Sequence, residues 1–205
     1  MRTAEFVSPK HPDKLCDRIS DAILDEYMSG DKNSRCAIET CGGHAKIFIT
    51  GEVTSKTDVS DDRIREIVYN LTGIDDVIIH IHEQSTYIAQ GVDVGGAGDQ
   101  GIMIGYACRE NDEMIPHEYY LARKLNKHIY EQYSFDGKTQ ITLNHNEVSV
   151  VASFQNAPKE NLEILVREFF EQYPQYKIVA LHCNPAGDWE KGSFQADAGV
   201  TGRKL

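Results

Sequence analysis

Residues 35 to 53 read Arg35-Cys-Ala-Ile-Glu-Thr-Cys-Gly-Gly-His-Ala-Lys-Ile-Phe-Ile-Thr-Gly-Glu-Val53, and this stretch decides the fold. The runs at 35–40 and 46–53, joined by the glycines at 42 and 43, have the pattern of two strands in a β-hairpin. A hairpin needs further elements to cover its apolar face. These elements must come from the sequence on either side of the hairpin or from another chain.

Two helices are predicted around the hairpin. Apolar residues from Leu15 to Tyr27 recur at helical spacing, which predicts a helix over roughly residues 12–29. A second helix begins after Ser60, a good N-cap residue, and ends at Gly73. The apolar run Val77-Ile-Ile-His-Ile81 then predicts a buried strand.

The same order of elements returns about 100 residues later, as in an internal duplication. After a glycine-rich stretch, the second copy comprises a strand at 101–106, a helix from Pro116, strands at 139–143 and 147–153, a helix from Pro158 and a strand at 176–181. Each copy is a β-α-β-β-α-β unit. The sequence thus predicts an α+β fold of tandem repeats, each a mostly antiparallel sheet with helices on one face. We assign residues 1–95 to the first repeat, and residues 96–205 to the second repeat plus the opening strand of an absent third repeat.

Composition argues against several classes of function. The formal net charge of −11 would repel a nucleic-acid backbone, so we expect no nucleic-acid partner. The longest apolar runs are far too short to span a membrane, and the first residues lack the apolar core of a signal peptide, so we expect a cytoplasmic protein without a membrane partner. Five scattered cysteines without a C-x-x-C pair indicate small core residues rather than disulfides or a zinc site.

A cluster of ionisable residues precedes the first helix. The stretch Ser8-Pro-Lys-His-Pro-Asp-Lys14 could place Asp13 on Mg²⁺, with His11 and Lys14 on phosphate oxygens near a helix N-terminus. A purely structural explanation is also open. Pro12 suits the first helical position, and Asp13 there favours the helix dipole whether or not a ligand binds.

Other charged or glycine-rich stretches have the same two explanations. The loop Gly95-Gly-Ala-Gly-Asp-Gln-Gly101 could approach a ligand closely or serve only as a connector, and it lacks the G-K-[S/T] of a P-loop. Asp136 and Lys138 open a predicted strand, and Asp197, Arg203 and Lys204 lie at the end of the chain. Such cations could hold a polyphosphate, or they could be ordinary surface charge.

Taken together, these pieces occur in an order that resembles the S-adenosylmethionine synthetase family over essentially the whole chain. The matching residues and motifs are His11-Pro-Asp-Lys14, Asp17-Arg-Ile-Ser-Asp-Ala22, Glu39, Gly51-Glu52, Gln84-Ser85, Ile88-Ala-Gln-Gly91, Gly96-Ala-Gly-Asp-Gln-Gly101, Lys138-Thr-Gln140, Asn184-Pro-Ala-Gly187 and Asp197-Ala-Gly-Val-Thr-Gly-Arg-Lys204. The family is built from three β-α-β-β-α-β-like repeats, so the resemblance implies that this chain holds the first two.

The resemblance implies a transferase of one-carbon metabolism that joins methionine to ATP. The methionine sulfur attacks C5′ of the ribose, the tripolyphosphate leaves, and the enzyme then hydrolyses it. Such a reaction depends on alignment and on stabilisation of the leaving charge. The family uses Mg²⁺ and K⁺, and its active sites lie between subunits whose flat sheet faces pack together, so an oligomer is expected.

Residue roles follow from the matching positions. The resemblance implies that His11 hydrogen-bonds the bridging oxygen at the cleaved bond, that Asp13 ligates Mg²⁺ and that Glu39 ligates K⁺. The other implied roles are phosphate binding by Lys138, Arg203 and Lys204, methionine binding by Glu52 and Gln84, substrate orientation by Asp99, and contacts to adenosine and methionine from Asp136 and Asp197. Trp189 stands where the family usually has a Phe that stacks on adenine. A structural explanation stays open for Glu39 and Glu52, which could instead pair with Lys or Arg across the hairpin.

The chain also departs from the family pattern. Pro9-Lys10 stands where the family usually has Glu-Gly, and Ser85-Thr-Tyr87 replaces the usual Ser-Pro-Asp beside the methionine site. The larger departure is the third repeat, whose lysines and aspartates complete the family's active site. We therefore expect a subunit of an oligomeric or split heteromeric synthetase, with a second chain supplying the third repeat. The alternative is a catalytically inactive regulatory or interaction relative.

Overall fold

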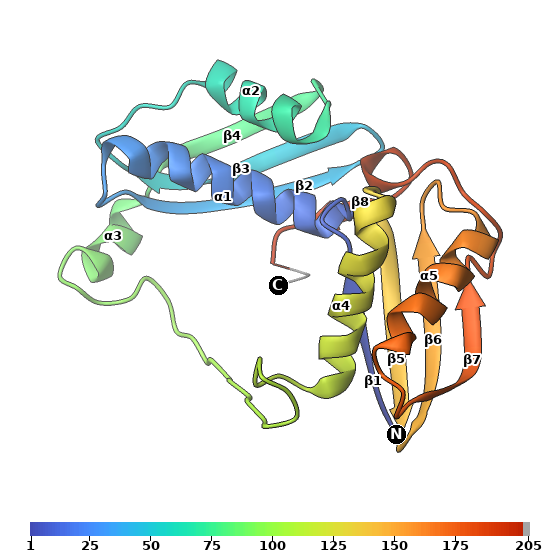
Figure 1. Ribbon diagram of the computed structural model, residues 1–205. Coiled ribbons are helices and arrows are strands. Elements are labelled where there is room, and N and C mark those ends of the chain that lie inside the picture. The colour runs from blue at the N-terminus through green and yellow to red at the C-terminus, as the bar shows by residue number, and fades with distance from the viewer. Residues whose placement is uncertain (203–205) are drawn as a thin grey trace. The chain divides into compact units, whose positions relative to one another are not determined.

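The computed structural model describes residues 1–202, which form two compact units. Unit 1 comprises Met1–His11 and Gly105–Ser193, and unit 2 comprises Pro12–Ile104 and the residues from Phe194 onward. Each unit contains one four-stranded sheet with two long helices on one face (Figure 1). The predicted α+β class with two mostly antiparallel sheets is therefore confirmed.

Unit 2 holds the hairpin predicted at residues 35–53. Its elements are α1 (Pro12–Gly30), β2 (Arg35–Gly43), β3 (Lys46–Thr54), α2 (Asp61–Thr72), β4 (Val77–Glu83), α3 (Thr86–Val92) and β8 (Ala198–Val200). The strand order is β4-β3-β2-β8, with only the β3–β4 pair parallel. Apolar side chains of α1 and α2 pack against one face of this sheet and form a core that includes Ile19, Ile23, Ile47, Ile49 and Val68.

The limits of α2 follow the local signals in the sequence. The Ser60 hydroxyl accepts a hydrogen bond from the Arg63 N–H at 3.3 Å, which satisfies one N-terminal donor of the helix. Gly73 ends the helix with φ at 74°, a left-handed conformation that glycine adopts at little cost. The predicted start and end of this helix are confirmed.

Unit 1 repeats the arrangement. Its elements are β1 (Arg2–Val7), α4 (His117–Gln132), β5 (Gly137–Asn144), β6 (Glu147–Phe154), α5 (Lys159–Glu171) and β7 (Lys177–Cys183). The 3-10 turn η1 (Ser193–Gln195) begins at the last residue of unit 1 and continues into unit 2. The strand order is β1-β5-β6-β7, and β6 and β7 are parallel. Helices α4 and α5 cover one face, with a core that includes Leu121, Leu125, Ile141, Val150 and Leu162.

The strands at the edges of the two sheets come from distant parts of the chain. Strand β1 precedes α1 in sequence but pairs with β5 of unit 1, and β8 follows unit 1 in sequence but pairs with β2 of unit 2. The repeat boundaries at 1–95 and 96–205 describe the sequence duplication and stay a prediction. In space, the two sequence repeats exchange edge strands, because β1 joins the sheet of the second repeat and β8 joins the sheet of the first.

One predicted strand is wrong. Residues 101–106 adopt no regular structure, and the side chains of Ile102, Met103 and Ile104 are 92% or more exposed. A strand requires a pairing partner for its backbone, and no described residue pairs with this segment. None of the helices within residues 1–202 is long and apolar enough to cross a membrane.

Candidate active site

The first group of predicted site residues lies in unit 1, where β1 ends and β5 begins. Ser8 fixes this corner, because its N–H donates to the Gly137 carbonyl at 2.8 Å and its hydroxyl donates to the Phe135 carbonyl at 2.8 Å. The His11 N–H in turn donates to the Ser8 carbonyl at 3.1 Å, and the His11 side chain is buried. The loop that carries His11 is therefore held against the start of β5.

Asp136 directly precedes β5 at this corner, and Lys138 is the second residue of the strand. Asp136 is buried, and its Oδ2 accepts a hydrogen bond from the Ser193 N–H at 2.8 Å, so the carboxylate fixes the return of the chain after α5 and β7. Lys138 pairs in register with Val7 of β1 and is exposed. Its side chain is thus accessible from solvent, and phosphate binding by its ammonium stays a prediction.

Trp189 is positioned by a turn at the end of β7. Buried Asn184 donates from its Nδ2 to the Ala157 carbonyl at 2.8 Å, while its Oδ1 accepts from the Phe154 N–H at 3.0 Å and from the Trp189 Nε1 at 3.3 Å. The indole is therefore held by its polar edge and is only partly buried. Asn184 is the residue that positions Trp189, and its place in the Asn-Pro-Ala-Gly motif is the signal that pointed to it.

The second group lies at the N-terminal end of α1 in unit 2. Asp13 is buried in the first turn, and its Oδ1 accepts a hydrogen bond from the Val200 N–H of β8 at 3.1 Å. One turn further on, the Asp17 Oδ1 accepts from the Gly202 N–H at 2.7 Å. The Thr201 hydroxyl donates to the Thr40 carbonyl at 2.9 Å. The start of α1 thus binds the segment that begins with β8.

Glu39 and Glu52 lie on the sheet face of unit 2 that carries no helix. In the register of the sheet, Glu39 lies opposite Thr50, and Glu52 lies opposite Ala37. Neither glutamate therefore has Lys or Arg directly across the hairpin, so the structural explanation through a cross-strand pair gains no support. On β4, His82 lies opposite Glu52 and His80 lies opposite Thr50, and the Nε2 atoms of the two histidines lie 3.0 Å apart.

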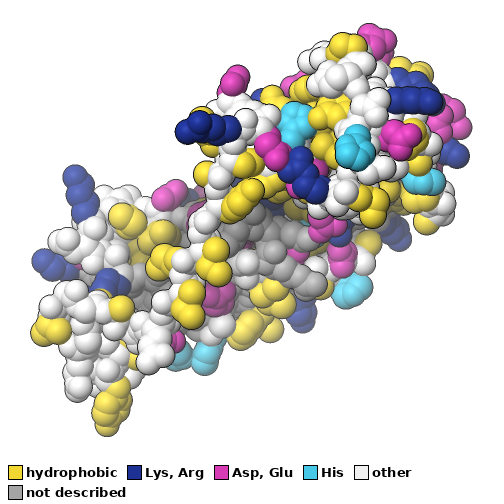
Figure 2. All heavy atoms as spheres, turned by 90° about the horizontal axis from the view of Figure 1, so that it is seen from below, with side chains coloured by type: hydrophobic (Ala, Val, Ile, Leu, Met, Phe, Trp, Pro, Cys, Tyr) yellow, Lys and Arg dark blue, Asp and Glu magenta, His cyan; other side chains and the backbone are white. Residues whose placement is uncertain are grey.

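An apolar row crosses the same open face. Val200 of β8, Cys41 of β2, Phe48 of β3 and Ile78 of β4 are consecutive partners in the register, and all four are exposed. Figure 2 shows exposed apolar side chains lying between acidic and basic ones on one face of the molecule. A row of this kind on an open sheet face is typical of a surface that packs against another sheet.

The remaining predicted residues lie at loop ends. The Gln84 Oε1 accepts from the Arg35 Nε at 3.3 Å and from the Thr54 hydroxyl at 3.5 Å. Asp99 and Asp197 are exposed, and each accepts a hydrogen bond from the backbone N–H of the next residue. The predicted phosphate ligands Arg203 and Lys204 lie outside the described residues.

The donor set is compatible with the expected cations. Within residues 1–202, no group of three or more His, Cys, Asp or Glu side chains could enclose a metal ion. Mg²⁺ at a nucleotide, however, needs only one or two protein carboxylates, since phosphates and waters supply the other oxygens. Asp13 provides one such carboxylate. Glu39, an exposed carboxylate opposite the Thr50 hydroxyl, provides hard oxygen donors of the kind that K⁺ accepts.

The two buried cysteines, Cys16 and Cys183, are not thiolates. Burial raises the pKa of Cys16 to about 12 and that of Cys183 to about 11, so both thiols stay neutral. These two are core residues, as predicted. Cys41 is exposed on the open sheet face, and for this residue the prediction of a core position is wrong.

One pocket is present in unit 2, with a volume of about 330 Å³. It lies between the ends of β3 and β4 and the loop before α2, and its lining includes Asp58, Asp61 and Glu83. None of the predicted site residues lines this pocket. The predicted site residues lie instead at the corner of unit 1, at the start of α1, on the open face of unit 2 and at the loop ends described above.

Comparison with known proteins gives consistent matches along the chain. Residues 1–92 match the family model described as S-adenosylmethionine synthetase, N-terminal domain, and residues 94–189 match its central domain. The S-adenosylmethionine synthase of Parvibaculum lavamentivorans is 36% identical, and that of Zymomonas mobilis is 38% identical, each over 99% of this chain. The chain spans 62% and 63% of the length of these two relatives.

A solved structure shows the same fold. The structure described as an unusual S-adenosylmethionine synthetase from Campylobacter jejuni superposes with a TM-score of 0.85 at 29% identity. The match covers 100% of this chain and 63% of that one. The alignment with the Parvibaculum lavamentivorans relative runs over 243 positions, more than the 205 residues of this chain, so the chain contains deletions relative to it.

Proposed function

The chain belongs to the S-adenosylmethionine synthetase family, of which it carries the first two of three domains, and from that premise we propose that it is a subunit of an S-adenosylmethionine-forming enzyme. A second chain supplies the third domain in this proposal. The observation that carries it is the corner of unit 1, where separate segments bring His11, Asp136 and Lys138 to the junction of β1 and β5.

The proposed reaction forms one bond and breaks one bond at the same carbon. The methionine sulfur donates an electron pair to C5′ of ATP, and the C5′–O bond breaks, with its electron pair leaving on the tripolyphosphate. Water then hydrolyses the tripolyphosphate to phosphate and pyrophosphate. No covalent bond to the protein forms, so the protein acts by alignment and by stabilising the leaving charge.

The residues of unit 1 have proposed roles on the leaving group. His11 donates a hydrogen bond to the bridging oxygen, where negative charge develops as the bond breaks. Lys138 places its exposed ammonium on the phosphates, and Arg203 and Lys204 add two further cations. Asp136 and the partly buried Trp189 bind the adenosine, the indole through its ring face.

The residues of unit 2 have proposed roles on methionine and the cations. Glu52 and Gln84 bind the amino acid, Asp99 orients the substrates, and Asp197 contacts the adenosine and methionine. Asp13 would hold Mg²⁺ and Glu39 would hold K⁺. The ions would neutralise part of the polyphosphate charge, which would otherwise add to the net charge of −11 on the chain.

A second candidate function has a specific observation in its favour. The chain spans only 62% of the length of the Parvibaculum lavamentivorans relative, so the groups of the family's third domain lie outside it. A chain that lacks them could bind nucleotide and modulate a full-length synthetase without catalysing the reaction. The two candidates differ in whether product forms once the third domain is supplied.

An assay with the purified chain tests the proposal. ATP, methionine, Mg²⁺ and K⁺ are added with and without the co-expressed C-terminal domain of the Parvibaculum lavamentivorans relative, and S-adenosylmethionine and phosphate are measured by mass spectrometry. Product that requires the added domain is expected. If nucleotide binds but no product forms in either case, the enzymatic proposal is contradicted and the regulatory candidate is supported.

A further inference from the structure

The segment 101–106, Gly-Ile-Met-Ile-Gly-Tyr, is the most exposed apolar stretch among the described residues. Its side chains at 102, 103 and 104 are 93%, 97% and 92% exposed, and Tyr106 is 75% exposed. Four large apolar side chains in six residues carry a clear free-energy cost in water. Such a run has the composition of a buried strand, which is what the sequence predicted.

The exchange of edge strands shows where this segment belongs. Strand β1 opens the first repeat, yet it pairs antiparallel with β5, the first hairpin strand of the second repeat. Strand β8, at the place where a third repeat would open, pairs antiparallel with β2, the first hairpin strand of the first repeat. Each repeat thus receives its edge strand from another repeat. The segment 101–106 opens the second repeat, and the sheet still to be supplied with an edge strand is that of a third repeat.

Sequence and local geometry relate the segment to β8. Asp99-Gln-Gly-Ile102 matches Asp197-Ala-Gly-Val200, and both aspartates make the same local contact. The Gln100 N–H donates to the Asp99 Oδ1 at 2.7 Å, and the Ala198 N–H donates to the Asp197 Oδ1 at 2.8 Å. The two segments therefore begin with the same aspartate side-chain contact, although only β8 has a partner strand among the described residues.

The glycine of the shared motif explains a close approach. A Cβ at Gly199 would collide with the backbone of Pro12 and Asp13, where α1 begins, so glycine is required for β8 to pass the start of that helix. Gly101 occupies the same motif position, but a Cβ there would meet nothing within 4 Å. The open space around Gly101 would therefore accommodate the first residues of a helix from another unit, as Gly199 accommodates the start of α1.

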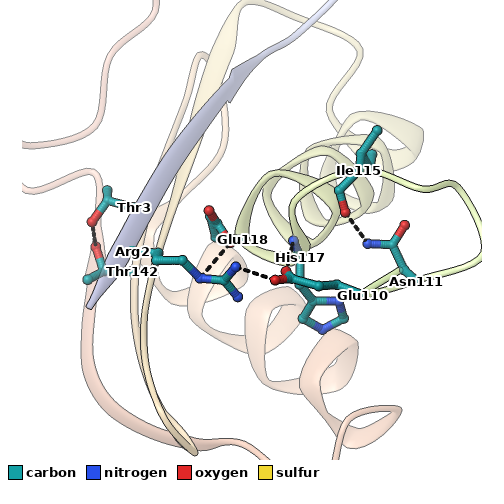
Figure 3. Close-up of polar contacts among 8 residues, drawn as sticks. All are labelled: Arg2, Thr3, Glu110, Asn111, Ile115, His117, Glu118 and Thr142. Carbon is teal, nitrogen blue, oxygen red and sulfur yellow. Dashed lines mark hydrogen bonds and ion pairs between the residues drawn. The ribbon is translucent and has the colours of Figure 1, made fainter. Parts of the chain in front are cut away.

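The segment is anchored at both ends. Downstream, the Cys108 N–H donates to the Met114 carbonyl at 3.0 Å, and Glu110 pairs with Arg2 of β1 while it accepts a hydrogen bond from the His117 N–H at 2.9 Å (Figure 3). Upstream, Asp93 pairs with Arg35 of β2 at 2.8 Å. The protein thus holds the flanks of residues 101–106 and leaves the apolar run itself exposed.

We propose that residues 101–106 form the edge strand of a third β-α-β-β-α-β unit carried by a second polypeptide, pairing antiparallel with the first hairpin strand of that unit. The partner assignment rests on the proposed function, whereas the strand assignment rests on the exchange of β1 and β8. Backbone hydrogen bonds would provide the affinity, and burial of the apolar side chains on the helix-covered face would add to it.

Proline substitutions test the proposal. An edge strand uses the N–H of every second residue, so one of the adjacent variants Met103→Pro and Ile104→Pro must remove a pairing hydrogen bond. Met103→Val and Ile104→Val, which keep the N–H and favour a strand, are the matched controls. Capture of each variant is measured with the tagged C-terminal domain of the Parvibaculum lavamentivorans relative, and circular dichroism of each chain alone verifies that the two units stay folded.

We expect at least one proline variant to be captured about tenfold or more weakly, while both valine controls are captured like the wild type. Hydrogen exchange at residues 102–106 should slow when the domain is bound. Wild-type capture by both proline variants, or no capture of the wild type, overturns the proposal. The proposal is also overturned if the proline variants lose self-association but are still captured by the added domain, because residues 101–106 would then pair with a second copy of this chain.

Capture and catalysis separate this proposal from the proposed function. Lys138→Ala should be captured normally even where it makes no product. A complex that forms through residues 101–106 but produces no S-adenosylmethionine would contradict the enzymatic proposal and leave the strand assignment standing. If product forms but the proline variants are captured like the wild type, the strand assignment is contradicted and the enzymatic proposal stands.

Discussion

At the scale of single residues, Lys138 is the predicted phosphate ligand whose side chain is most clearly available. It is exposed on β5, next to the corner that holds His11 and Asp136. Lys138→Ala should lower the rate of product formation by the assembled enzyme at least about a hundredfold, since removal of one donor to developing charge typically costs that much. The rate is measured by mass spectrometry of S-adenosylmethionine.

The matched control for this variant is Lys177→Ala, which removes an exposed lysine from β7 of the same sheet and has no predicted role. Both variants should unfold cooperatively, like the wild type, in denaturant. A Lys138→Ala enzyme with the wild-type rate would refute the assignment. Equal losses in both variants would indicate a general charge effect instead of a contact to phosphate.

His117 makes stability depend on pH. Burial next to the rings of Tyr120 and Tyr176 lowers the pKa of His117 below its ordinary value of 6.5, although Glu110 opposes this shift. The unfolded state therefore binds more protons in this range. The contribution of neutral His117 to the free energy of unfolding is therefore fully present above about pH 6.5, and it is lost as the pH falls through the lower folded-state pKa of His117.

Thermal unfolding between about pH 7.5 and about pH 5.5 measures this effect. The wild type should lose stability on acidification, and His117→Gln should lose less, because glutamine cannot take up a proton. His182→Gln, at an exposed position on β7, is the control and should follow the wild type. Parallel curves for wild type and His117→Gln would contradict the role of His117.

At the scale of elements, the glycines of the two related segments should behave differently in the isolated chain. Gly199→Ala places a Cβ against the backbone at the start of α1, and overpacking of this kind costs about 1–3 kcal/mol of unfolding free energy. Gly101→Ala meets nothing within 4 Å and should leave stability nearly unchanged. Denaturant unfolding of both variants measures the difference, and a similar loss in the two would contradict the assigned packing.

Local signals in the sequence predicted most elements but could not predict the strand exchange. The limits of α2 were predictable because Ser60 and Gly73 act on their own helix. Strand β1 was not predicted, because half of its residues are exposed and its partner β5 lies more than a hundred residues away in sequence. The strand predicted at 101–106 has the right composition, but composition cannot supply a partner. Pairing over such distances is a property of the whole chain.

For the predicted site residues too, the residue type could be predicted, but the long-range contacts could not. The resemblance to a family identified Asp13 and Asp136 by type and position. It could not show that Asp13 accepts a hydrogen bond from Val200, or that Asp136 accepts one from Ser193. These contacts join residues far apart in sequence, so each carboxylate holds a distant segment of the chain in place, and the ligand roles of both stay predictions.

At the scale of the whole molecule, the open face of unit 2 bears on assembly. The row formed by Val200, Cys41, Phe48 and Ile78 is apolar and exposed, and the glutamates proposed to bind K⁺ and methionine lie on the same face. Exposure of these apolar side chains to water is unfavourable, and a second apolar sheet face packed against them would remove them from water. We therefore expect the chain to associate through this face.

Phe48→Glu places a charge in the middle of that row, and burial of an unpaired carboxylate in an interface is strongly unfavourable. Light scattering at micromolar concentration should show an oligomer for the wild type and a monomer for Phe48→Glu. Tyr69→Glu, on the exposed side of α2, is the matched control and should remain an oligomer. If Phe48→Glu keeps the wild-type mass, the open face of unit 2 does not mediate assembly, and Glu39 and Glu52 must then act without a neighbouring chain.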